Sequence, residues 1–277
     1  PLPASVYNRI YGPTPPVVHR LEQVLGKGKV FNHVTRFDKL KFYETLSKTP
    51  LGEHLPKTQA YTPTDLAAFL TTHRAVILKP RHGQLGRDIY LIRQNNETYE
   101  LYYSSKHPII AYERLDELVQ RMDGVVDKNF IMQAFIPAAT TEGRIFDLRF
   151  LVQKNDTGQW QVTASLSRIS LKYSYITNLL HRIDPVERTL LDLDIPLIPD
   201  LDFLSEICLT CARLLEEPLG SMGELSVDLM LDETGHPWII EANGKPMKEM
   251  FAELGDEDLT AEVYMVPIKY AKSLAVQ

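Results

Sequence analysis

The hydrophobic pattern of the chain alternates between two periods. Apolar residues three and four positions apart are typical of helices, whereas short apolar runs bounded by Gly, Pro and polar residues are typical of strands. The first pattern predicts helices at 17–25, 38–47, 63–73, 112–121, 201–215 and 260–275. The second predicts strands at 75–80, 89–92, 99–103, 129–137, 145–153, 160–169, 225–231 and 238–240. The stretch 171–200 follows neither pattern, and we expect an irregular loop that could close over a site.

The stretch 223–246 is the most informative part of this pattern. Its two apolar runs flank the polar residues 232–237, whose Gly and Pro predict the turn of a hairpin. Alternation places Glu241 and Asn243 on one face of the second strand, and the hairpin can bring Asp228 beside them. Three oxygen-bearing side chains would then converge at one end of a sheet.

An all-oxygen cluster of this kind suits Mg²⁺, which takes one or two carboxylates together with substrate phosphates. The alternative is that Asp228 faces solvent on an edge strand and that Glu241 merely ends a strand, since acids at strand ends are common. The hairpin alone favours neither interpretation. Phosphate-binding groups elsewhere in the chain decide between them.

A lysine and two glycines between predicted strands favour a nucleotide. Lys79 interrupts the apolar run 75–80, and Gly83 and Gly86 lie in the loop that follows. Glycines let the backbone approach a polyphosphate closely, and successive N–H groups in such a loop form an anion nest. The alternative is a hairpin with a flexible tip and a surface lysine. The loop matches neither a Walker A loop nor a dinucleotide fingerprint.

Further cations occur where a phosphate site could use them. Asp38 is expected to cap the helix that begins at Lys39, which leaves this lysine free to point away from the core. Arg149 shares a strand face with Asp147, and Arg168 is expected on the neighbouring antiparallel strand. A cross-strand ion pair and stabilisation of a transferring phosphoryl group are both open for Arg149.

Composition narrows the class of protein. The 277 residues suggest one or two domains, and 44% hydrophobic and 24% charged residues are those of an ordinary globular protein. The net charge of −6 argues against nucleic acid or an anionic membrane as the main partner. No stretch reaches the roughly 20 apolar residues of a membrane span and no signal peptide is evident, so we expect a cytoplasmic protein. The first residue is Pro, which leaves open that an N-terminal part precedes it.

The two cysteines, Cys208 and Cys211, form a C-x-x-C pair that raises the question of a redox or zinc site. Both lie inside the predicted helix 201–215, and the chain contains no second cysteine pair that would complete a zinc site. We therefore expect both to be buried in the core.

Taken in order, these residues resemble the ATP-grasp superfamily. The order is Asp38-Lys39, Leu78-Lys79-Pro80, Gly83, Gly86, Gln133-x-Phe-Ile, Asp147-x-Arg149, Arg168, Asp228, Glu241-x-Asn243 and Pro246. The C-terminal part is similar to D-alanine:D-alanine ligase, glutathione synthetase and the ribosomal-protein glutamate ligases. Three segments resemble the YheC/YheD type of ATP-grasp protein, which is associated with the coat of bacterial endospores. They are Val6-Tyr-Asn-Arg-Ile, Phe146-Asp-Leu-Arg-Phe-Leu-Val-Gln-Lys and Trp238-Ile-Ile-Glu-Ala-Asn-Gly-Lys-Pro.

The resemblance implies an α+β, two-lobed ATP-grasp fold with ATP between two antiparallel-sheet subdomains. It implies an N-terminal segment at 1–60, a central subdomain at 61–130 and a metal-binding subdomain at 131–277. Site roles follow by position. Lys39 and Lys79 would contact the phosphates, and the loop from Gly83 to Gly86 would cover them. The adenine would be held by Gln133, Ala134, Phe135 and Ile136. Mg²⁺ would be bound by Asp228, Glu241 and Asn243, and the transferred phosphoryl group would be stabilised by Arg149 and Arg168.

The implied activity is that of an ADP-forming ligase. ATP would phosphorylate a carboxylate, and an amine would displace the phosphate to form an amide or peptide bond on an amino acid or peptide. The loop side chains Lys172, Asn178, His181 and Arg182 would face this substrate. A site of lysines, arginines and Mg²⁺ suits phosphoryl transfer, which needs positioning and charge neutralisation more than a protein nucleophile.

One departure from the family pattern supports a different function. Related ligases carry a glycine-rich turn after the pair Thr177-Asn178, whereas this chain continues with Leu-Leu-His-Arg-Ile-Asp. A nucleotide-binding or catalytically degenerate ATP-grasp protein, acting as a structural component of the spore coat among other coat proteins, is therefore the alternative. A third possibility is a kinase that stops at an acyl or alkyl phosphate.

Overall fold

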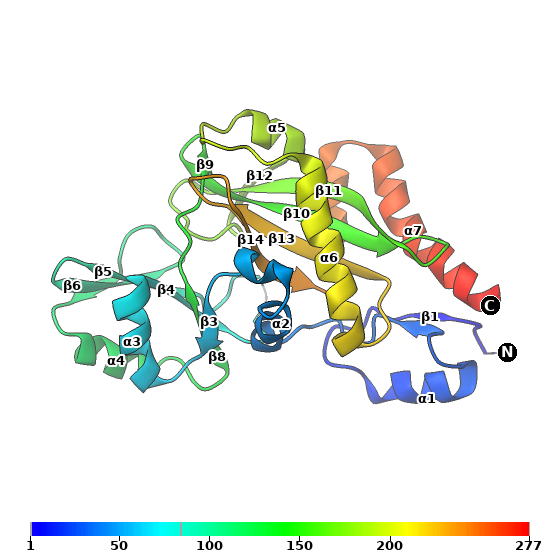
Figure 1. Ribbon diagram of the computed structural model, residues 1–277, viewed down its shortest axis with the longest axis horizontal. Helices are drawn as coiled ribbons and strands as arrows, with labels where there is room; N and C mark the ends of the chain where they lie inside the picture. Colours follow the sequence, from blue (N-terminus) through cyan, green and yellow to red (C-terminus); the bar gives the residue numbers. More distant parts are fainter. Residues whose placement is uncertain (1, 84, 277) are drawn as a thin grey trace.

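Two antiparallel sheets and the helices that cover them build the protein (Figure 1). The computed structural model describes residues 2–83 and 85–276. Its α-helices are α1 (Pro16–Leu25), α2 (Lys39–Leu46), α3 (Pro63–His73), α4 (Leu115–Asp123), α5 (Val186–Leu191), α6 (Leu201–Leu219) and α7 (Glu257–Val276), and its 3₁₀ helices are η1 (Pro50–His54) and η2 (Lys248–Leu254).

The central lobe is built on a six-stranded sheet with the order β3-β8-β4-β5-β6-β7. Its strands are β3 (Thr58–Ala60), β8 (Phe130–Ala134), β4 (Ala75–Pro80), β5 (Tyr90–Asn95), β6 (Thr98–Tyr103) and β7 (Ile110–Tyr112). Alternate side chains such as Val76, Leu78 and Met132 pack with helices α3 and α4 on one face. The opposite face, which carries Ile77 and Lys79, is therefore left for the interior of the molecule.

The C-terminal lobe is built on a second sheet, whose main order is β12-β11-β10-β13-β14. Its strands are β9 (Thr140–Thr141), β10 (Arg144–Lys154), β11 (Trp160–Ser170), β12 (Leu180–Asp184), β13 (Glu224–Leu231) and β14 (Pro237–Asn243). On β10, Phe146, Leu148 and Phe150 pack in the core that includes α6. Leu151 belongs to the opposite face and packs in a core with η2 and α7. Asp147 and Arg149 share this second face, as the alternating pattern predicts.

The N-terminal segment lies against the C-terminal lobe through the parallel pair β1 (Val6–Tyr7) and β2 (Val30–Phe31). Asn32 fastens it there. The buried Asn32 has φ of 58°, and its side chain makes four hydrogen bonds, at 2.8–3.0 Å, to the backbone of Gly223, Glu224 and Gly244. Asparagine tolerates this backbone conformation, and the paired amide compensates its strain.

Most predicted elements are confirmed within a few residues, including the hairpin of β13 and β14. Two expectations were wrong. The helix expected at 112–121 begins only at Leu115, because Ile110–Tyr112 pairs with β6 as strand β7. The stretch 171–200 is not irregular throughout, since it contains β12, which pairs with β11, and the short helix α5.

The cysteine prediction is confirmed. Cys208 and Cys211 are unpaired by disulfide and fully buried on α6 in the main core of the C-terminal lobe. Burial raises the pKa of both thiols, which makes the reactive thiolate rarer at neutral pH. Among the described residues, no helix is both long enough and apolar enough to cross a membrane.

Candidate nucleotide-binding site

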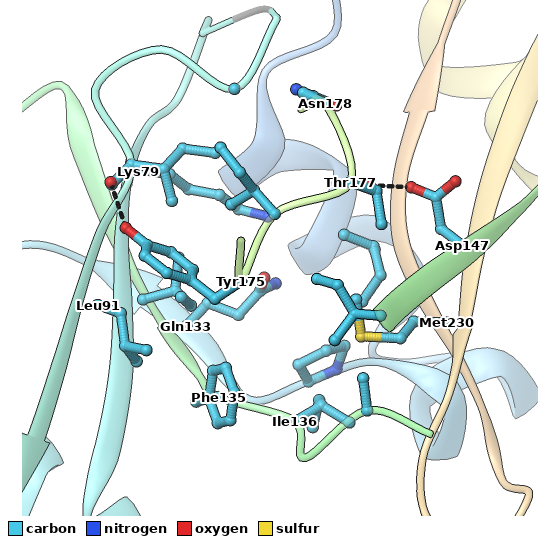
Figure 2. A pocket seen from close by; sticks show the side chains of 18 of the residues that line it. Lys79, Leu91, Gln133, Phe135, Ile136, Asp147, Tyr175, Thr177, Asn178 and Met230 are labelled. Atoms are coloured by element: carbon cyan, nitrogen blue, oxygen red, sulfur yellow. Dashed lines mark hydrogen bonds between the residues drawn. The ribbon is translucent and has the colours of Figure 1, made fainter. Parts of the chain in front are cut away.

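A cavity of about 530 Å³ lies between the two lobes. The central sheet contributes the face that its helices leave open, and the C-terminal sheet contributes the ends of β10, β11, β13 and β14. Apolar side chains such as Ile77, Leu91 and Phe135 gather at one end, where Arg93 lies over the Phe135 ring, and the charged side chains Lys39, Asp228 and Glu241 also line the cavity. Figure 2 shows this arrangement, with Leu91 and Phe135 on the side opposite Asp147. A concave site with an apolar part and a few convergent charges is typical of a ligand pocket.

Lys79 is the central-lobe cation of this cavity. It follows Ile77 on the open face of β4 and is 5% exposed. Burial, with the nearby charge of Lys39, lowers the pKa of Lys79 to about 8. No acidic side chain of 2–83 or 85–276 forms an ion pair with it. The charge of Glu241 opposes this lowering only in part. A buried ammonium group without an ion-pair partner in contact is costly, and a bound anion would reduce that cost.

Lys39 reaches the same region from the first residue of α2. Asp38 caps this helix by accepting hydrogen bonds from the backbone N–H groups of Leu40 and Lys41, as predicted. The Lys39 Nζ atom donates to the carbonyl oxygen of Gly83 at 2.9 Å and lies 3.6 Å from Glu241 Oε2. Lys39 therefore joins the glycine loop of the central lobe to the acidic end of the C-terminal lobe.

The glycine loop between β4 and β5 covers this end of the cavity. Gly86 has φ of 67°, and a Cβ atom there would lie 2.6 Å from the Asn178 side-chain nitrogen. The position therefore excludes side chains on both conformational and steric grounds. The Arg81 guanidinium group binds both oxygens of Asp38 at 3.1 and 2.5 Å, which holds the start of the loop against α2.

Four buried charges form a network across β11, β10 and β13. Arg149 donates to both oxygens of Asp228, which stands opposite it in the strand register, at 2.8 and 2.7 Å. Arg168 donates to both oxygens of Asp147 at 2.7 and 2.6 Å and to Asp228 at 2.8 Å. All four side chains are at most 7% exposed. Both interpretations of Arg149 remain compatible with its ion pair, but its side chain lies behind Asp228 and outside the cavity lining.

The pKa values of the two acids move in opposite directions. Burial alone would raise the pKa of Asp228, but Arg149 and Arg168 outweigh burial and lower it. Burial raises the pKa of Asp147, and the neighbouring charge of Asp228 raises it further against the opposing effect of Arg168. Asp228 is thus the firmly ionised acid of the network.

Glu241 and Asn243 lie on β14, where Glu241 stands opposite Asp228 in the register. The Asn243 Nδ2 atom donates to Glu241 Oε1 at 3.1 Å, so the amide oxygen of Asn243 stays available. The Glu241 side chain is 28% exposed. Burial would raise the pKa of Glu241, but the charges of Lys39 and Lys79 together with the hydrogen bond from Asn243 outweigh burial and lower it. Glu241 is therefore an ionised carboxylate that opens onto the cavity.

Oxygen donors suitable for Mg²⁺ are present, but they differ in how many of their acceptor positions are already used by hydrogen bonds. Among the described residues, no three His, Cys, Asp or Glu side chains gather as a metal cluster. Asp228 already accepts three guanidinium hydrogen bonds, and a carboxylate has about four lone-pair positions, so about one remains. Glu241 and the amide oxygen of Asn243 are less occupied. Since Mg²⁺ commonly binds one or two carboxylates and completes its shell with phosphates and water, this donor set fits it.

The segment Ser174 to Asn178 spans the cavity from one lobe to the other. We call it the strap. Tyr175 inserts into the central lobe, where its hydroxyl donates to the Ile89 carbonyl oxygen at 2.8 Å and accepts from the Ser104 N–H group at 3.1 Å. On the other side, the Thr177 hydroxyl donates to Asp147. Figure 2 shows the Tyr175 and Thr177 side chains extending to opposite sides of the cavity. The strap therefore links the apolar end of the cavity to the charge network.

The structure brings most of the predicted site residues to one cavity and leaves some outside it. The lining includes Lys39, Lys79, Gly83, Gly86, Gln133, Ala134, Phe135, Ile136, Arg168, Asn178, Asp228 and Glu241. Arg149 and Asn243 lie directly behind this lining. Lys172 and His181 are exposed, and Arg182 pairs with Glu142 and Asp184, so none of these three lines the cavity. Their expected contact with substrate has no support from their positions.

The sequence did not indicate that Tyr175 inserts into the central lobe or that Thr177 forms a hydrogen bond with Asp147. The strap was assigned to an irregular loop, although Tyr175 is 7% exposed and Thr177 also 7%. Alternation in Leu171-Lys-Tyr-Ser-Tyr-Ile-Thr-Asn is the signal that could have indicated an extended, half-buried segment. Its contacts with β5 and β6 are tertiary and have no local signature.

Two lobes that close on a cavity with paired lysines and an acidic hairpin define an ATP-grasp protein. Among solved structures, the chain resembles N5-carboxyaminoimidazole synthetase from Staphylococcus aureus complexed with ADP, with a TM-score of 0.59, 12% identity and coverage of 93% of this chain and 59% of that chain. It also resembles ATP-grasp ligase PsnB complexed with minimal precursor, with a TM-score of 0.56, 13% identity and coverage of 96% and 79%. These likenesses show the fold.

Within this class, residues 27–274 match the YheC/D like ATP-grasp family, and the chain belongs to that family. It is 24% identical over 230 residues to the endospore coat-associated protein YheC of Bacillus subtilis (strain 168), covering 81% of this chain and 63% of YheC. It is 26% identical over 277 residues to the endospore coat-associated protein YheD of the same strain, covering 91% of this chain and 58% of YheD. The chain thus spans about three fifths of each relative.

Replacing Tyr175 by Phe tests the strap. We expect this variant to lose about 1–3 kcal/mol of unfolding free energy, because the Ile89 carbonyl and the Ser104 N–H group lose a buried partner. Urea unfolding measures the loss. The matched control is Tyr173→Phe, since Tyr173 is 61% exposed and lies two positions away. Equal stabilities of the two variants would contradict the prediction.

Proposed function

We propose that this protein is an ATP- and Mg²⁺-dependent ligase that joins the carboxylate of one substrate to the amine of another. The observation that carries the proposal is the buried Lys79, which has no acidic partner among the residues described and faces a cavity shared with Lys39, Arg168 and Glu241. A triphosphate would supply the missing negative charge between the lobes. The apolar end beside Leu91 and Phe135 would take the base.

Each group has a role in the proposed reaction. Lys39 and Lys79 bind phosphate oxygens, and the loop from Gly83 to Gly86 covers them. The backbone from Gln133 to Ile136 holds the adenine. Arg168 lines the cavity and faces the phosphoryl group, whereas Arg149 acts through Asp228 as a positioning residue. These groups neutralise and orient charge, which is the main requirement of phosphoryl transfer.

The metal would be held by Glu241 and Asn243, with Asp228 contributing its remaining acceptor position. When bound, Mg²⁺ would polarise the phosphates and neutralise their charge. The Lys39 Nζ atom lies 3.6 Å from Glu241 Oε2, so its charge would orient this carboxylate. With Lys39 and the metal in place, the negative charges of the triphosphate and of the carboxylates would not face each other without a cation between them.

The chemistry balances without a protein nucleophile. An oxygen of the carboxylate takes the γ-phosphoryl group, the bond to the β-phosphate oxygen breaks, and ADP leaves. The amine nitrogen then attacks the acyl carbon, the bond from this carbon to the phosphate oxygen breaks, and phosphate leaves while the nitrogen loses a proton. An amino acid or peptide is the proposed substrate class.

The alternative is a catalytically degenerate ATP-grasp protein that binds nucleotide and serves as a structural component. Its support is the segment after Asn178, where Leu179 and Leu180 are exposed and Arg182 is committed to acidic neighbours. The likeness of this chain to two endospore coat-associated proteins supports a place in the spore coat for this alternative, with coat proteins as partners. The ligase and the degenerate protein differ in turnover.

ADP release separates these functions. We expect ATP with Mg²⁺ to raise the melting temperature, because a ligand at about 100 times its Kd stabilises the folded state by about 2.7 kcal/mol. A pool of amino acids and peptides should then accelerate ADP release and yield an amide product detected by mass spectrometry. Nucleotide binding without stimulated release would favour the degenerate protein. A missing thermal shift would refute both, and ADP without an amide would indicate a kinase.

ATP affinity should depend on the charge of Lys79. Because the pKa of Lys79 is about 8, the ammonium form prevails below pH 8 and is lost above it. We expect the Kd of ATP to be level below about pH 7, to be about doubled at pH 8 and to rise up to about tenfold by pH 9, one pH unit above that pKa. Isothermal titration calorimetry at several pH values across this range measures the Kd of ATP. Lys79→Arg keeps its charge and should abolish the rise, whereas an unchanged rise in that variant would assign the effect to another group.

A further inference from the structure

Asn32 bridges β13 and β14 just beyond the point where their pairing ends. The last pair in the register of these two strands is Ser226 with Asn243. Beyond this pair, the Asn32 Nδ2 atom donates to the Glu224 carbonyl oxygen at 2.8 Å and to the Gly244 carbonyl oxygen at 2.9 Å. A single amide group therefore holds the two strands together next to Asn243, which is one of the proposed metal ligands.

Further contacts fix Asn32 in this position. Its Oδ1 atom accepts from the backbone N–H groups of Gly223 and Glu224 at 2.8 and 3.0 Å, so both N–H groups and both lone pairs of the amide are used. The Asn8 Nδ2 atom donates to the Asn32 carbonyl oxygen at 2.8 Å. Asn32 is 0% exposed and has φ of 58°. A buried residue other than glycine keeps this conformation where surrounding contacts impose it, and such residues are frequent at functional sites.

The segment 31–34 also packs closely on the backbone of both strands. A Cβ atom at Gly223, just before β13, would lie 2.6 Å from Phe31 Cδ2. A Cβ atom at Gly244, just after β14, would lie 2.6 Å from the Val34 carbonyl oxygen. A side chain at either glycine would therefore push this segment away from the hairpin. The N-terminal part of the chain is thus fitted to the same end of the hairpin that carries the proposed metal ligands.

We propose that Asn32 is a positioning residue for the Mg²⁺ site and acts on Asn243 through Gly244. The proposal rests on the ligase function proposed above. Because Gly244 directly follows Asn243, the hydrogen bond to the Gly244 carbonyl oxygen fixes the end of β14 and with it the direction of the Asn243 side chain. In that direction the Asn243 Nδ2 atom donates to Glu241 Oε1 at 3.1 Å, which leaves the amide oxygen for the metal. Contacts that orient the ligands of a metal commonly set its affinity.

Two substitutions remove this contact in different ways. Asn32→Asp tolerates the φ of 58° and can still accept from Gly223 and Glu224, but an ionised carboxylate cannot donate to Gly244. Asn32→Gly suits the backbone conformation and removes all four hydrogen bonds of the side chain. Leu204→Ala is the matched control, because it opens a cavity in the core of the C-terminal lobe and lowers stability without changing the contacts of Asn32. Thermal unfolding gives a temperature at which all variants are folded.

Metal affinity is measured directly, with Mn²⁺ in place of Mg²⁺. Mn²⁺ is titrated into protein that holds the ATP analogue AMP-PNP, with the protein in excess over the nucleotide, and electron paramagnetic resonance reports the free ion. We expect the Kd of Mn²⁺ to rise about 10–100-fold in both Asn32 variants and to stay within about twofold of wild type in Leu204→Ala. In the ligase assay, the rate of ADP release in Asn32→Asp should recover when Mg²⁺ is raised, because the substitution weakens the metal site without removing a ligand.

The Kd of Mn²⁺ also decides against the proposal where it fails. An unchanged Kd in the folded Asn32 variants would overturn the positioning role. An equal rise in Leu204→Ala would overturn it as well, since the effect would then follow from lost stability. If wild-type protein holds no Mn²⁺ beyond that bound by the nucleotide alone, the metal-dependent function proposed above fails together with the role of Asn32. The binding measurement needs no turnover, so it decides this role even where the ligase assay shows no product.

Discussion

Glu241→Gln is expected to lower substrate-stimulated ADP release by about 10²–10³-fold. The variant keeps the shape of the side chain but removes the ionised oxygen that would hold Mg²⁺ against the phosphates. Lewis-acid stabilisation of several kcal/mol depends on that ligand, and each 1.36 kcal/mol corresponds to about tenfold in rate. Initial rates of ADP release at saturating ATP, with Mg²⁺ varied, measure the loss. Excess Mg²⁺ should restore part of the rate, because a weakened site can still be filled.

The same variant should fold normally. Glu241 and Lys39 form a partly exposed pair at 3.6 Å, with 28% and 16% of their side chains exposed, and such pairs contribute about 0–1 kcal/mol. We therefore expect the melting temperature without ligand to fall by no more than about 2–4 °C. Glu187→Gln is the matched control, since Glu187 is exposed in the first turn of α5. Equal activity of the two variants would exclude Glu241 from the reaction.

Asp228→Asn should be the most destabilising single substitution in the charge network. The amide cannot accept from both guanidinium groups, so Arg149 and Arg168 remain buried with only Asp147 as a counter-charge. Removing one partner of a buried ion pair costs about 3–5 kcal/mol. Urea unfolding of the wild type and the variant measures the difference. A loss below about 1 kcal/mol would mean that Arg168 and Asp147 compensate it.

A double-mutant cycle shows whether the loss arises from the stranded charge. Arg149→Met combined with Asp228→Asn should be more stable than Asp228→Asn alone, because the second change removes the unpaired cation and leaves an apolar side chain of similar length. If the losses simply add, Arg149 and Asp228 do not stabilise each other. The double variant would then be the least stable of the series.

The pH dependence of this loss follows from the direction of the pKa shift. The pKa of Asp228 is lower in the folded protein than in the unfolded chain, because the two arginines outweigh burial. Its stabilising effect is therefore complete above the unfolded pKa of about 3.9 and declines as the pH falls through the lower folded value. The contribution of Asp228 to the stability difference between wild type and Asp228→Asn should therefore stay constant from pH 7 down to about 5, and a change in this range would come from Asp147, whose raised pKa depends in part on the charge of Asp228.

Local patterns predicted those parts of the site that depend on near neighbours in the chain. The hairpin of β13 and β14 follows from two apolar runs around a polar turn, and its pairing places Glu241 opposite Asp228. The cap at Asp38 follows from its place before an amphipathic stretch, and it leaves Lys39 at the start of the helix. Sequence reasoning failed for the strap because Tyr175 finds its partners at Ile89 and Ser104, far away in the chain.

What the sequence determined by itself was the set of elements, the family resemblance and the charged side chains that a nucleotide site needs. Side-chain periods of 3.6 and 2 residues depend only on local backbone geometry, so they can be read without the fold. Only the tertiary structure decided which charges pair. The strand order β11-β10-β13 brings Asp228 to Arg149 and Arg168, which are 79 and 60 positions away in the chain. Their pairing depends on packing and desolvation, and these leave no periodic trace in the sequence.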